Sequence, residues 1–194
     1  MLPFLTKEII FMHDMKIYSI SDKYISYLRE KNPNVYSNKI ESRTHTRKYI
    51  GVVISIGEFK YYIPMSSPKE TDYQIAGDTK VIKKSIVPII RIVVKNSDGV
   101  KELKGTLRIS HMIPVPESEL ELYDLDNEKD IAYKELVQNE IIFIRKNQEK
   151  IKNNANVLYK QKKENDMSAG YVKSALPYIE LEKYCLEYAK KIEE

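Results

Sequence analysis

The stretch Tyr61-Tyr62-Ile63-Pro64-Met65-Ser66-Ser67-Pro68-Lys69 decides how this sequence folds and where its chemistry lies. Its first half is apolar and aromatic, which is typical of a buried β-strand. Pro68 fixes its own φ and holds Ser67 in an extended conformation, so the strand runs into a stiff turn. Two hydroxyls and the Lys69 ammonium on such a turn predict an anion site, although the same residues are common in ordinary solvated turns. Both interpretations stay open on this stretch alone.

The composition is that of a globular protein with one sizeable core. The 194 residues are 42% hydrophobic and 31% charged, and no apolar run approaches the about 20 residues that span a bilayer. A single cysteine, Cys185, excludes an internal disulfide, so we expect a cytoplasmic protein with no membrane partner. The three histidines show no zinc-ligand spacing, and we expect no metal and no cofactor. A net charge of +4 permits a nucleic-acid partner without requiring one.

Strands precede the long helices along the chain. A strand at 16–20 leads into a short helix that Ser21 or Asp22 caps and that Asn32-Pro33 ends. The polar stretches 34–46 and 70–84 are predicted to be loops. Further strands are predicted at 49–56, 59–65, 85–94, 103–110 and 111–115, with Pro88 indicating an edge strand or a bulge. This order favours an α+β fold, in which helices pack outside a strongly bent antiparallel sheet or small barrel.

The last third of the chain is predicted to be helical. An apolar seam with steps of three and four residues indicates one long helix, formed by Val137, Ile141, Ile144, Gln148, Ile151, Ala155 and Leu158. Between residues 145 and 163 there is one acid against seven bases: Arg145, Lys146, Lys150, Lys152, Lys160, Lys162 and Lys163. Such a one-sided helix binds a polyanion or is merely solvated. Pro177 is expected to start a last helix.

Several stretches, taken in order, resemble the ToxN/AbiQ endoribonuclease toxins of type III toxin–antitoxin and abortive infection systems. They are Lys16-Ile17-Tyr18-Ser19-Ile20-Ser21, Lys23-Tyr24-Ile25, Tyr27-Leu28, Arg47-Lys48-Tyr49-Ile50-Gly51-Val52-Val53, Tyr62 to Lys69, Met112-Ile113-Pro114-Val115 and Phe143-Ile144-Arg145-Lys146-Asn147. No single piece is specific, but the ordered set is. The resemblance covers residues 15–194 and implies a single endoribonuclease domain with a core similar to that of MazF-like toxins. Residues 1–14 have no counterpart, and we interpret them as an N-terminal extension, either disordered or read from an upstream start codon.

The resemblance also implies site residues and partners. The family's catalytic serine falls on Ser67, its hydroxyl neighbour on Ser66, its lysine on Lys69, its early-helix tyrosine on Tyr24 and a basic residue on Arg47. Relatives can carry lysine where Arg47 stands, and arginine cannot serve as a base. The implied inhibitor is a small repeat RNA that folds as a pseudoknot, in a closed protein–RNA assembly. It would bind a groove formed by Lys39, Arg43, Lys48 and the seven bases between residues 145 and 163.

Metal-free RNA cleavage uses the 2′-hydroxyl as nucleophile and leaves a 2′,3′-cyclic phosphate. The protein must supply a proton acceptor, a proton donor and cations for the phosphorane. Lys69 and Arg47 can stabilise that charge, and Ser66 and Ser67 can hold the scissile phosphate. Tyr24 can contact a phosphate oxygen, or it can be an ordinary core tyrosine; no residue is an obvious general base. The rival hypotheses are a non-catalytic nucleic-acid-binding module and a scaffold with solvated lysines.

Overall fold

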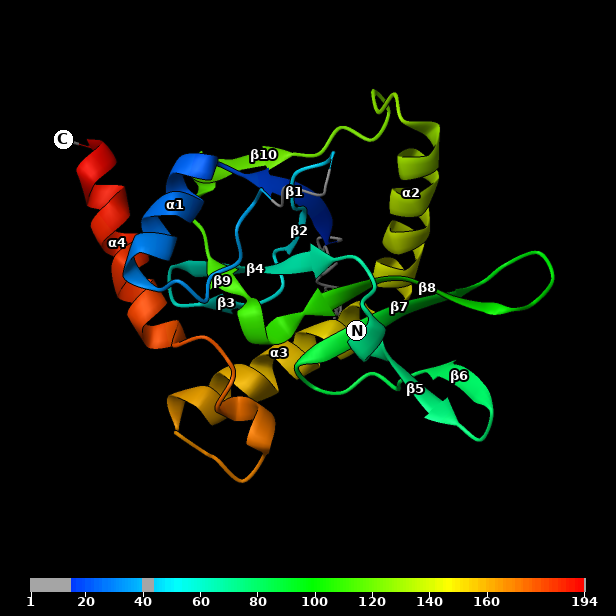
Figure 1. The fold of residues 1–194 in the computed structure, drawn as a ribbon. Coiled ribbons are helices and arrows are strands. Elements are labelled where there is room, and N and C mark those ends of the chain that lie inside the picture. The colour runs from blue at the N-terminus through cyan, green and yellow to red at the C-terminus, as the bar shows by residue number, and fades with distance from the viewer. Residues whose placement is uncertain (1–14, 40–43, 194) are drawn as a thin grey trace, which may run out of the picture.

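The structure is a computed structural model that describes residues 15–39 and 44–193. An antiparallel sheet forms its centre and four helices lie around it (Figure 1). The α+β class and the antiparallel sheet predicted from the sequence are thereby confirmed. The predicted extension at residues 1–14 lies outside the described residues, so its interpretation stays a prediction.

The sheet is open. Its main path runs through β10 (Leu120–Leu122), β1 (Lys16–Ile20), β2 (Tyr49–Gly51), β4 (Phe59–Ser66), β8 (Lys101–Arg108) and β7 (Ile89–Lys95). A barrel needs every strand to be paired on both sides, whereas within the described residues β10 pairs only with β1 and β7 only with β8. The predicted small barrel is therefore wrong, and the likeness to MazF-like toxins stays a prediction. For the strand predicted at 85–94, Pro88 indicated an edge position or a bulge; the edge position is confirmed, since β7 (Ile89–Lys95) ends the sheet.

The strand β4 is the centre of the sheet because it pairs along its whole length. Its first half pairs with the short strands β3 (Ser55–Ile56) and β9 (Ile113–Pro114), and its second half with β2 and β8. Residues 61–66 of β4 are consequently all buried. The stretch from Tyr61 to Ser66 thus runs through the middle of the core, and the turn that carries Ser67 and Lys69 leaves the sheet directly after it.

Two predicted elements are interrupted or replaced. The predicted strand 49–56 is split into β2 and β3, because Val53 and Ile54 both bond to the single residue Tyr61, which is the geometry of a β-bulge. The predicted loop 70–84 contains a 3-10 turn, η1 (Glu70–Asp72), and a separate hairpin of β5 (Tyr73–Ala76) and β6 (Thr79–Ile82). That hairpin is mostly exposed, so its sequence carries no apolar alternation to reveal it. The predicted strand 85–94 begins later, at Ile89.

The helices are α1 (Asp22–Lys31), α2 (Ile131–Lys146), α3 (Gln148–Lys163) and α4 (Tyr178–Glu193). Ser21 caps α1 as predicted, since its hydroxyl accepts from the Tyr24 N–H. The prediction of a single long C-terminal helix is wrong, because the helix is interrupted at Asn147, between α2 and α3. The residues of the predicted apolar seam are nevertheless buried on both sides of this interruption, apart from the half-buried Ile141.

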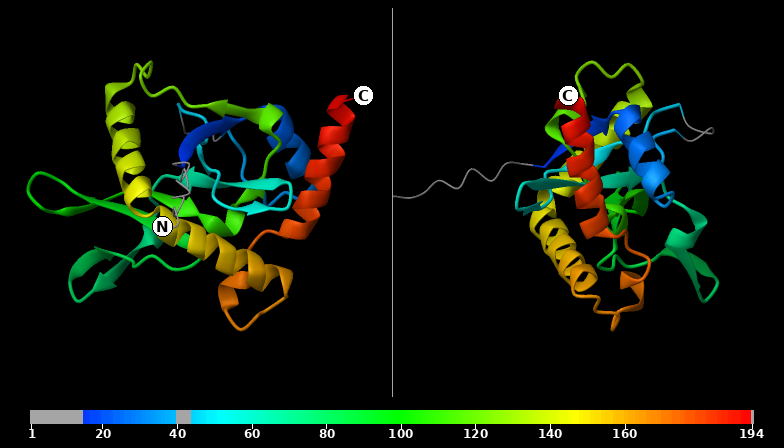
Figure 2. Two further views of the ribbon diagram at one scale, coloured as in Figure 1. Left: turned by 180° about the vertical axis from the view of Figure 1, so that it is seen from behind. Right: turned by 90° about the vertical axis from the view of Figure 1, so that its left-hand side faces the viewer.

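These two helices lie on different parts of the sheet. The helix α2 packs on β7 and β8, whereas α3 contacts α4 and η2 (Ile109–His111) (Figure 2). The remaining 3-10 turns are η3 (Glu117–Glu119) and η4 (Gly170–Val172). Within the described part of the chain, no helix combines the length and the apolar character that crossing a membrane requires.

Candidate active site

Arg47 is a buried cation at the end of β4. It precedes β2, and the antiparallel pairing of β2 with β4 brings it beside the C-terminal end of β4. Its Nη1 donates to the Met65 carbonyl at 2.8 Å and to the Ser66 Oγ at 2.9 Å, and its Nε donates to the Ser37 carbonyl at 3.0 Å. The Tyr36 ring lies 4.7 Å from the guanidinium carbon. Arg47 and the Ser-Ser-Pro-Lys turn therefore meet at one end of the sheet.

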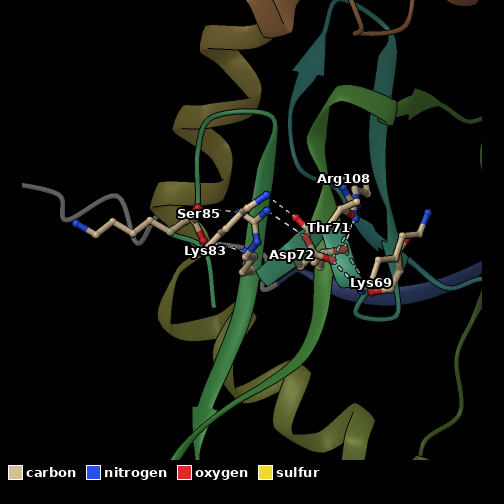
Figure 3. A network of polar contacts seen from close by, with 10 residues as sticks. Lys69, Thr71, Asp72, Lys83, Ser85 and Arg108 are labelled. Atoms are coloured by element: carbon tan, nitrogen blue, oxygen red, sulfur yellow. Dashed lines mark hydrogen bonds and ion pairs between the residues drawn. The ribbon is translucent and has the colours of Figure 1, made fainter. Parts of the chain in front are cut away.

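The turn itself is held by Asp72. The Lys69 N–H donates to the Asp72 Oδ2 at 3.0 Å, and the Asp72 N–H donates to the Lys69 carbonyl at 2.9 Å. Figure 3 shows the Lys69 side chain extending away from this network, and Lys69 and Ser67 are both exposed. The turn therefore has a fixed backbone and presents a free-standing ammonium and a hydroxyl to solvent.

Asp72 is in turn neutralised by two arginines from the sheet. Its Oδ1 lies 3.1 Å from Arg91 Nη2 and its Oδ2 lies 3.4 Å from Arg108 Nη2, while the carboxylate is almost wholly buried. The 3.1 Å contact is an ion pair whose angles fall outside those of a hydrogen bond. Arg91 Nη1 also donates to the Lys84 carbonyl, and Arg108 Nε donates to the Thr106 hydroxyl. The turn that carries Lys69 is thus connected through the Asp72 carboxylate to β7 and β8.

A pocket of about 250 Å³ opens beside Ser66 and Ser67. It lies between the end of β4, the segment before β2, β8 and the first half of α2, and its lining is both charged and apolar. The lining residues are Thr44, His45, Thr46, Arg47, Lys48, Met65, Ser66, Ser67, Lys104, Asp130, Tyr133, Leu136 and Glu140. The structure thus brings Arg47, Ser66 and Ser67 to one cavity, with Lys69 on the turn that follows.

Two side-chain pairs form one wall of this pocket. The His45 ring stacks on Tyr133 with centroids 3.7 Å apart, and His45 Nε2 lies 3.2 Å from the Asp130 Oδ2. Asp130 is also the N-cap of α2, where it accepts from the Tyr133 N–H. Both contacts stabilise the carboxylate and lower its pKa. A planar ring stack at the mouth of a pocket is suited to a nucleobase.

Two further groups have a shifted pKa here. Burial lowers the pKa of the Lys48 ammonium, which bonds to the hydroxyls of Ser19 and Thr46. Burial, with the positive charges of Arg108, Arg47 and Lys69, lowers the pKa of His111 to about 4. At neutral pH His111 is therefore uncharged. Its ring stacks on Tyr36 with centroids 4.1 Å apart, and the Tyr36 ring also contacts the Arg47 guanidinium.

Tyr24 lies apart from the pocket. It is fully buried on α1, its hydroxyl donates to the Pro114 carbonyl at 2.7 Å, and its ring meets Tyr188 edge-on. Burial is the largest cause that raises its pKa well above the ordinary value. The hydroxyl is enclosed in the core and does not face this pocket, which is the geometry of a core tyrosine; a catalytic role for Tyr24 stays a prediction.

The basic residues predicted to bind RNA fall into three groups. Lys39 is exposed and pairs with Asp22 at 2.9 Å, Lys48 lines the pocket, and Arg43 lies outside the described residues. On α3, Lys162 donates to the Val172 carbonyl and Lys152 lies 3.9 Å from Glu149. The other five residues point to solvent: Arg145, Lys146, Lys150, Lys160 and Lys163. The structure does not gather the whole set around the pocket, because the break at Asn147 turns α3 away from α2 (Figure 2).

Sequence reasoning missed Asp72 and Glu140, the two most buried carboxylates near the turn. Asp72 lies in a polar stretch that reads as a loop, so nothing indicated its burial. Glu140 lies three positions after Val137 and four positions before Ile144, which places it on the buried face of α2. An acid at such a position on an apolar face was a detectable signal.

Comparisons with known proteins identify the family of this chain. Residues 16–186 match the sequence profile of the family described as "Toxin ToxN, type III toxin-antitoxin system". Endoribonuclease ToxN of Pectobacterium atrosepticum is 32% identical over 74% of this chain and 79% of its own length. Endoribonuclease AbiQ of Lactococcus lactis subsp. lactis is 30% identical over 97% of this chain and 96% of its own.

Solved structures of the same kind share the fold. The structure of AbiQ, described as a lactococcal anti-phage endoribonuclease of a type III toxin–antitoxin system, superposes with a TM-score of 0.71 at 26% identity, over 91% of this chain and 98% of that one. A chain from a type III system with selective toxin inhibition by a non-coding RNA pseudoknot gives 0.70 at 25% identity, with the same coverage. The chain therefore belongs to the ToxN/AbiQ family of endoribonuclease toxins of type III toxin–antitoxin systems.

Proposed function

We propose that this toxin cleaves RNA without a metal ion, by attack of a 2′-hydroxyl on the adjacent phosphate. The products are a 2′,3′-cyclic phosphate and a 5′-hydroxyl, and the substrates are cellular or phage messenger RNAs in the cytoplasm. The observation that carries this proposal is the contact between Arg47 and Ser66. It places a buried, permanently charged guanidinium at the strand end where Ser66 and Ser67 face a pocket.

Each residue of the cluster has a chemical task in this reaction. The phosphorane gains negative charge, and a guanidinium fixed by backbone carbonyls meets that charge without reorganising. The Ser66 and Ser67 hydroxyls donate hydrogen bonds to the scissile phosphate. Lys69 adds a second cation from a turn whose backbone Asp72 holds in place.

The first experiment tests catalysis at Ser67. The purified protein is incubated with a short RNA in EDTA, beside the same RNA carrying a 2′-deoxynucleotide at the cleavage position. We expect the RNA to be cut to a cyclic phosphate and the deoxy substrate to remain intact. Ser67→Ala should lose about 10²–10³-fold in rate, whereas Ser97→Ala, an exposed serine in the β7–β8 turn, should cleave normally. Cleavage of the deoxy substrate would exclude 2′-hydroxyl attack, and RNA binding with no cleavage would favour the non-catalytic module.

The proposed inhibitor is a small repeat RNA that folds as a pseudoknot and forms a closed assembly with the toxin. The support comes from the solved relatives, in which a non-coding RNA regulates an antiviral system or inhibits the toxin as a pseudoknot. On this chain, Lys150, Lys160 and Lys163 are the exposed lysines of α3, opposite the face formed by Ile151 and Ala155. They are suited to phosphate contacts, which position an RNA without reading its bases.

Charge reversal tests this surface. Changing Lys150, Lys160 and Lys163 to Glu should weaken binding of the repeat RNA and reduce its log–log salt slope by about 0.7–0.9 for each lost phosphate contact. Cleavage of a short RNA should persist, because a short strand need only reach Ser67. The control reverses three exposed lysines elsewhere, Lys173, Lys183 and Lys190, with the same change in net charge. Equal effects of the two triple variants would show that α3 has no special role.

A further inference from the structure

Glu140 is a buried carboxyl that faces the pocket from α2. It lies on the same face of the helix as Val137 and Ile144, and its side chain is 8% exposed. Its Oε1 stands 2.5 Å from the point that a Cβ of residue 105 would occupy, and the Ser66 carbonyl stands 3.3 Å from the same point. Gly105 on β8 therefore makes room for this carboxyl beside the end of β4.

Within residues 15–39 and 44–193 this carboxyl makes no hydrogen bond and no ion pair, and burial is the one cause of its shifted pKa. A buried charge without a partner is strongly disfavoured, so the neutral acid is the stable form. Burial raises the pKa of Glu140 to about 8. At neutral pH the pocket thus holds a carboxylic acid with a proton to donate.

The charged neighbours of Glu140 come from each element that borders the pocket. His45, Arg47 and Lys48 precede β2, Lys104 lies on β8, and Asp130 is the N-cap of α2. Each is engaged elsewhere: Lys104 with Glu102 at 2.6 Å, Lys48 with two hydroxyls, and Arg47 with Ser66 and backbone carbonyls. His45 and Asp130 pair with each other. A bound phosphodiester would add negative charge and hold the proton on Glu140 more firmly.

We propose that Glu140 is the general acid of this ribonuclease and protonates the 5′-oxygen that leaves the scissile phosphate. The inference rests on the proposed function and supplies the proton donor that the sequence left unassigned. The 2′-oxygen forms a bond to phosphorus while its proton passes to a water molecule. The bond from phosphorus to the 5′-oxygen breaks, its electron pair stays on that oxygen, and the oxygen takes the proton of Glu140. The hydronium ion formed from that water molecule then returns a proton to the Glu140 carboxylate, which restores both groups.

A carboxyl in this position is better placed for the task than the neighbouring cations. Arg47 stays protonated throughout, so it stabilises charge and cannot transfer a proton. Lys69 stands on the exposed side of the turn, where solvent surrounds it. Glu140 lines the same cavity as Ser66 and Ser67 and is protonated near the working pH, which is the condition for efficient proton transfer.

The test separates proton donation from packing. Wild type and Glu140→Gln, a neutral variant of equal size, are assayed on two oligoribonucleotides. One is ordinary RNA; the other carries sulfur in place of the 5′-oxygen at the cleavage site, so its leaving group needs no proton. We expect Glu140→Gln to lose about 10²–10⁴-fold on the oxygen substrate and to cleave the sulfur substrate within a few-fold of wild type. Glu135→Gln, an exposed position on the same helix, is the control and should behave as wild type.

The outcomes distinguish this inference from the proposed function. Normal cleavage of ordinary RNA by Glu140→Gln would show that Glu140 only packs, and equal losses on both substrates would show that it acts in binding or folding. Absence of cleavage by the wild type would overturn the proposed function itself. The wild type gives a second measurement should the variant be unstable: above pH 8, cleavage of the oxygen substrate should fall about tenfold per pH unit, and cleavage of the sulfur substrate should not. Parallel pH profiles would contradict the inference.

Discussion

Two buried carboxylates lie on opposite faces of β8, and they differ in whether they are paired. Asp72 faces the side of Thr106 and Arg108, where two arginines neutralise it. Glu140 faces the side of Gly105, where no described residue bonds to its carboxyl. Successive residues of a strand point to opposite faces, so one strand separates the two environments. The paired carboxylate of Asp72 fixes the position of the turn and the strands that it contacts, whereas the unpaired carboxyl of Glu140 keeps its proton because burial raises its pKa.

Removing the charge of Asp72 should have the largest effect on stability. Asp72→Asn leaves the guanidinium of Arg91, which is 5% exposed, without its counter-ion. Breaking a buried ion pair from one side costs about 3–5 kcal/mol. Urea unfolding should show this loss, while Asp78→Asn in the exposed β5–β6 turn should leave the free energy of unfolding nearly unchanged. A loss below 1 kcal/mol in Asp72→Asn would mean that water replaces the carboxylate, and the contrast with Glu140 would disappear.

The pH dependence of stability should reveal Glu140. Its pKa is about 8 in the folded protein against 4.5 ordinarily, so the folded state keeps a proton that the unfolded state releases. The stabilisation is complete below pH 4.5 and is lost as the pH rises through 8, by at most about 1.4 kcal/mol per pH unit and on the order of a few kcal/mol in total. Glu140→Gln should remove this decline in urea unfolding between pH 5 and 9. If the two proteins decline equally, the carboxyl is ionised when folded.

Much of the fold follows from the sequence, and its failures have physical causes. The β4 stretch and the meeting of Arg47 with Ser66 are predictable, because an apolar strand and a hairpin fix which residues lie at one end of a sheet. The break at Asn147 is not, since the apolar seam continues across it and only the direction of the axis changes. The burial of Asp72 is not predictable for another reason: it depends on ion pairs with Arg91 and Arg108, which lie far along the chain. Pairing across such distances leaves no local pattern.

Adding one methyl group at residue 105 should disturb the Glu140 side of β8 selectively. The Cβ of Gly105→Ala would stand 2.5 Å from Glu140 Oε1, so the carboxyl must move into the pocket. The clashing atom is the end of a flexible side chain, so the loss of stability should lie near the lower end of the about 1–3 kcal/mol that overpacking costs, while cleavage should fall because the carboxyl has moved. Gly170→Ala is the matched control, since its Cβ would meet no atom within 4 Å. Both variants are compared by thermal unfolding and by cleavage rate. Unchanged cleavage in Gly105→Ala would show that the position of the carboxyl is unimportant.

The smallest effect on stability should come from Lys69. Its backbone N–H and carbonyl bond to Asp72, while its ammonium extends into solvent (Figure 3), so the turn should keep its shape when the side chain is removed. Lys69→Ala should change the free energy of unfolding by no more than about 0.5 kcal/mol, as should Lys101→Ala at an exposed position of β8. Of these two variants, Lys69→Ala should slow cleavage, because Lys69 lies on the same turn as Ser67 whereas Lys101 lies at the start of β8. Urea unfolding and cleavage rates of the two variants separate these roles. A large loss of stability in Lys69→Ala would place its side chain in the Asp72 network, whereas unchanged cleavage would leave Arg47 to stabilise the phosphorane.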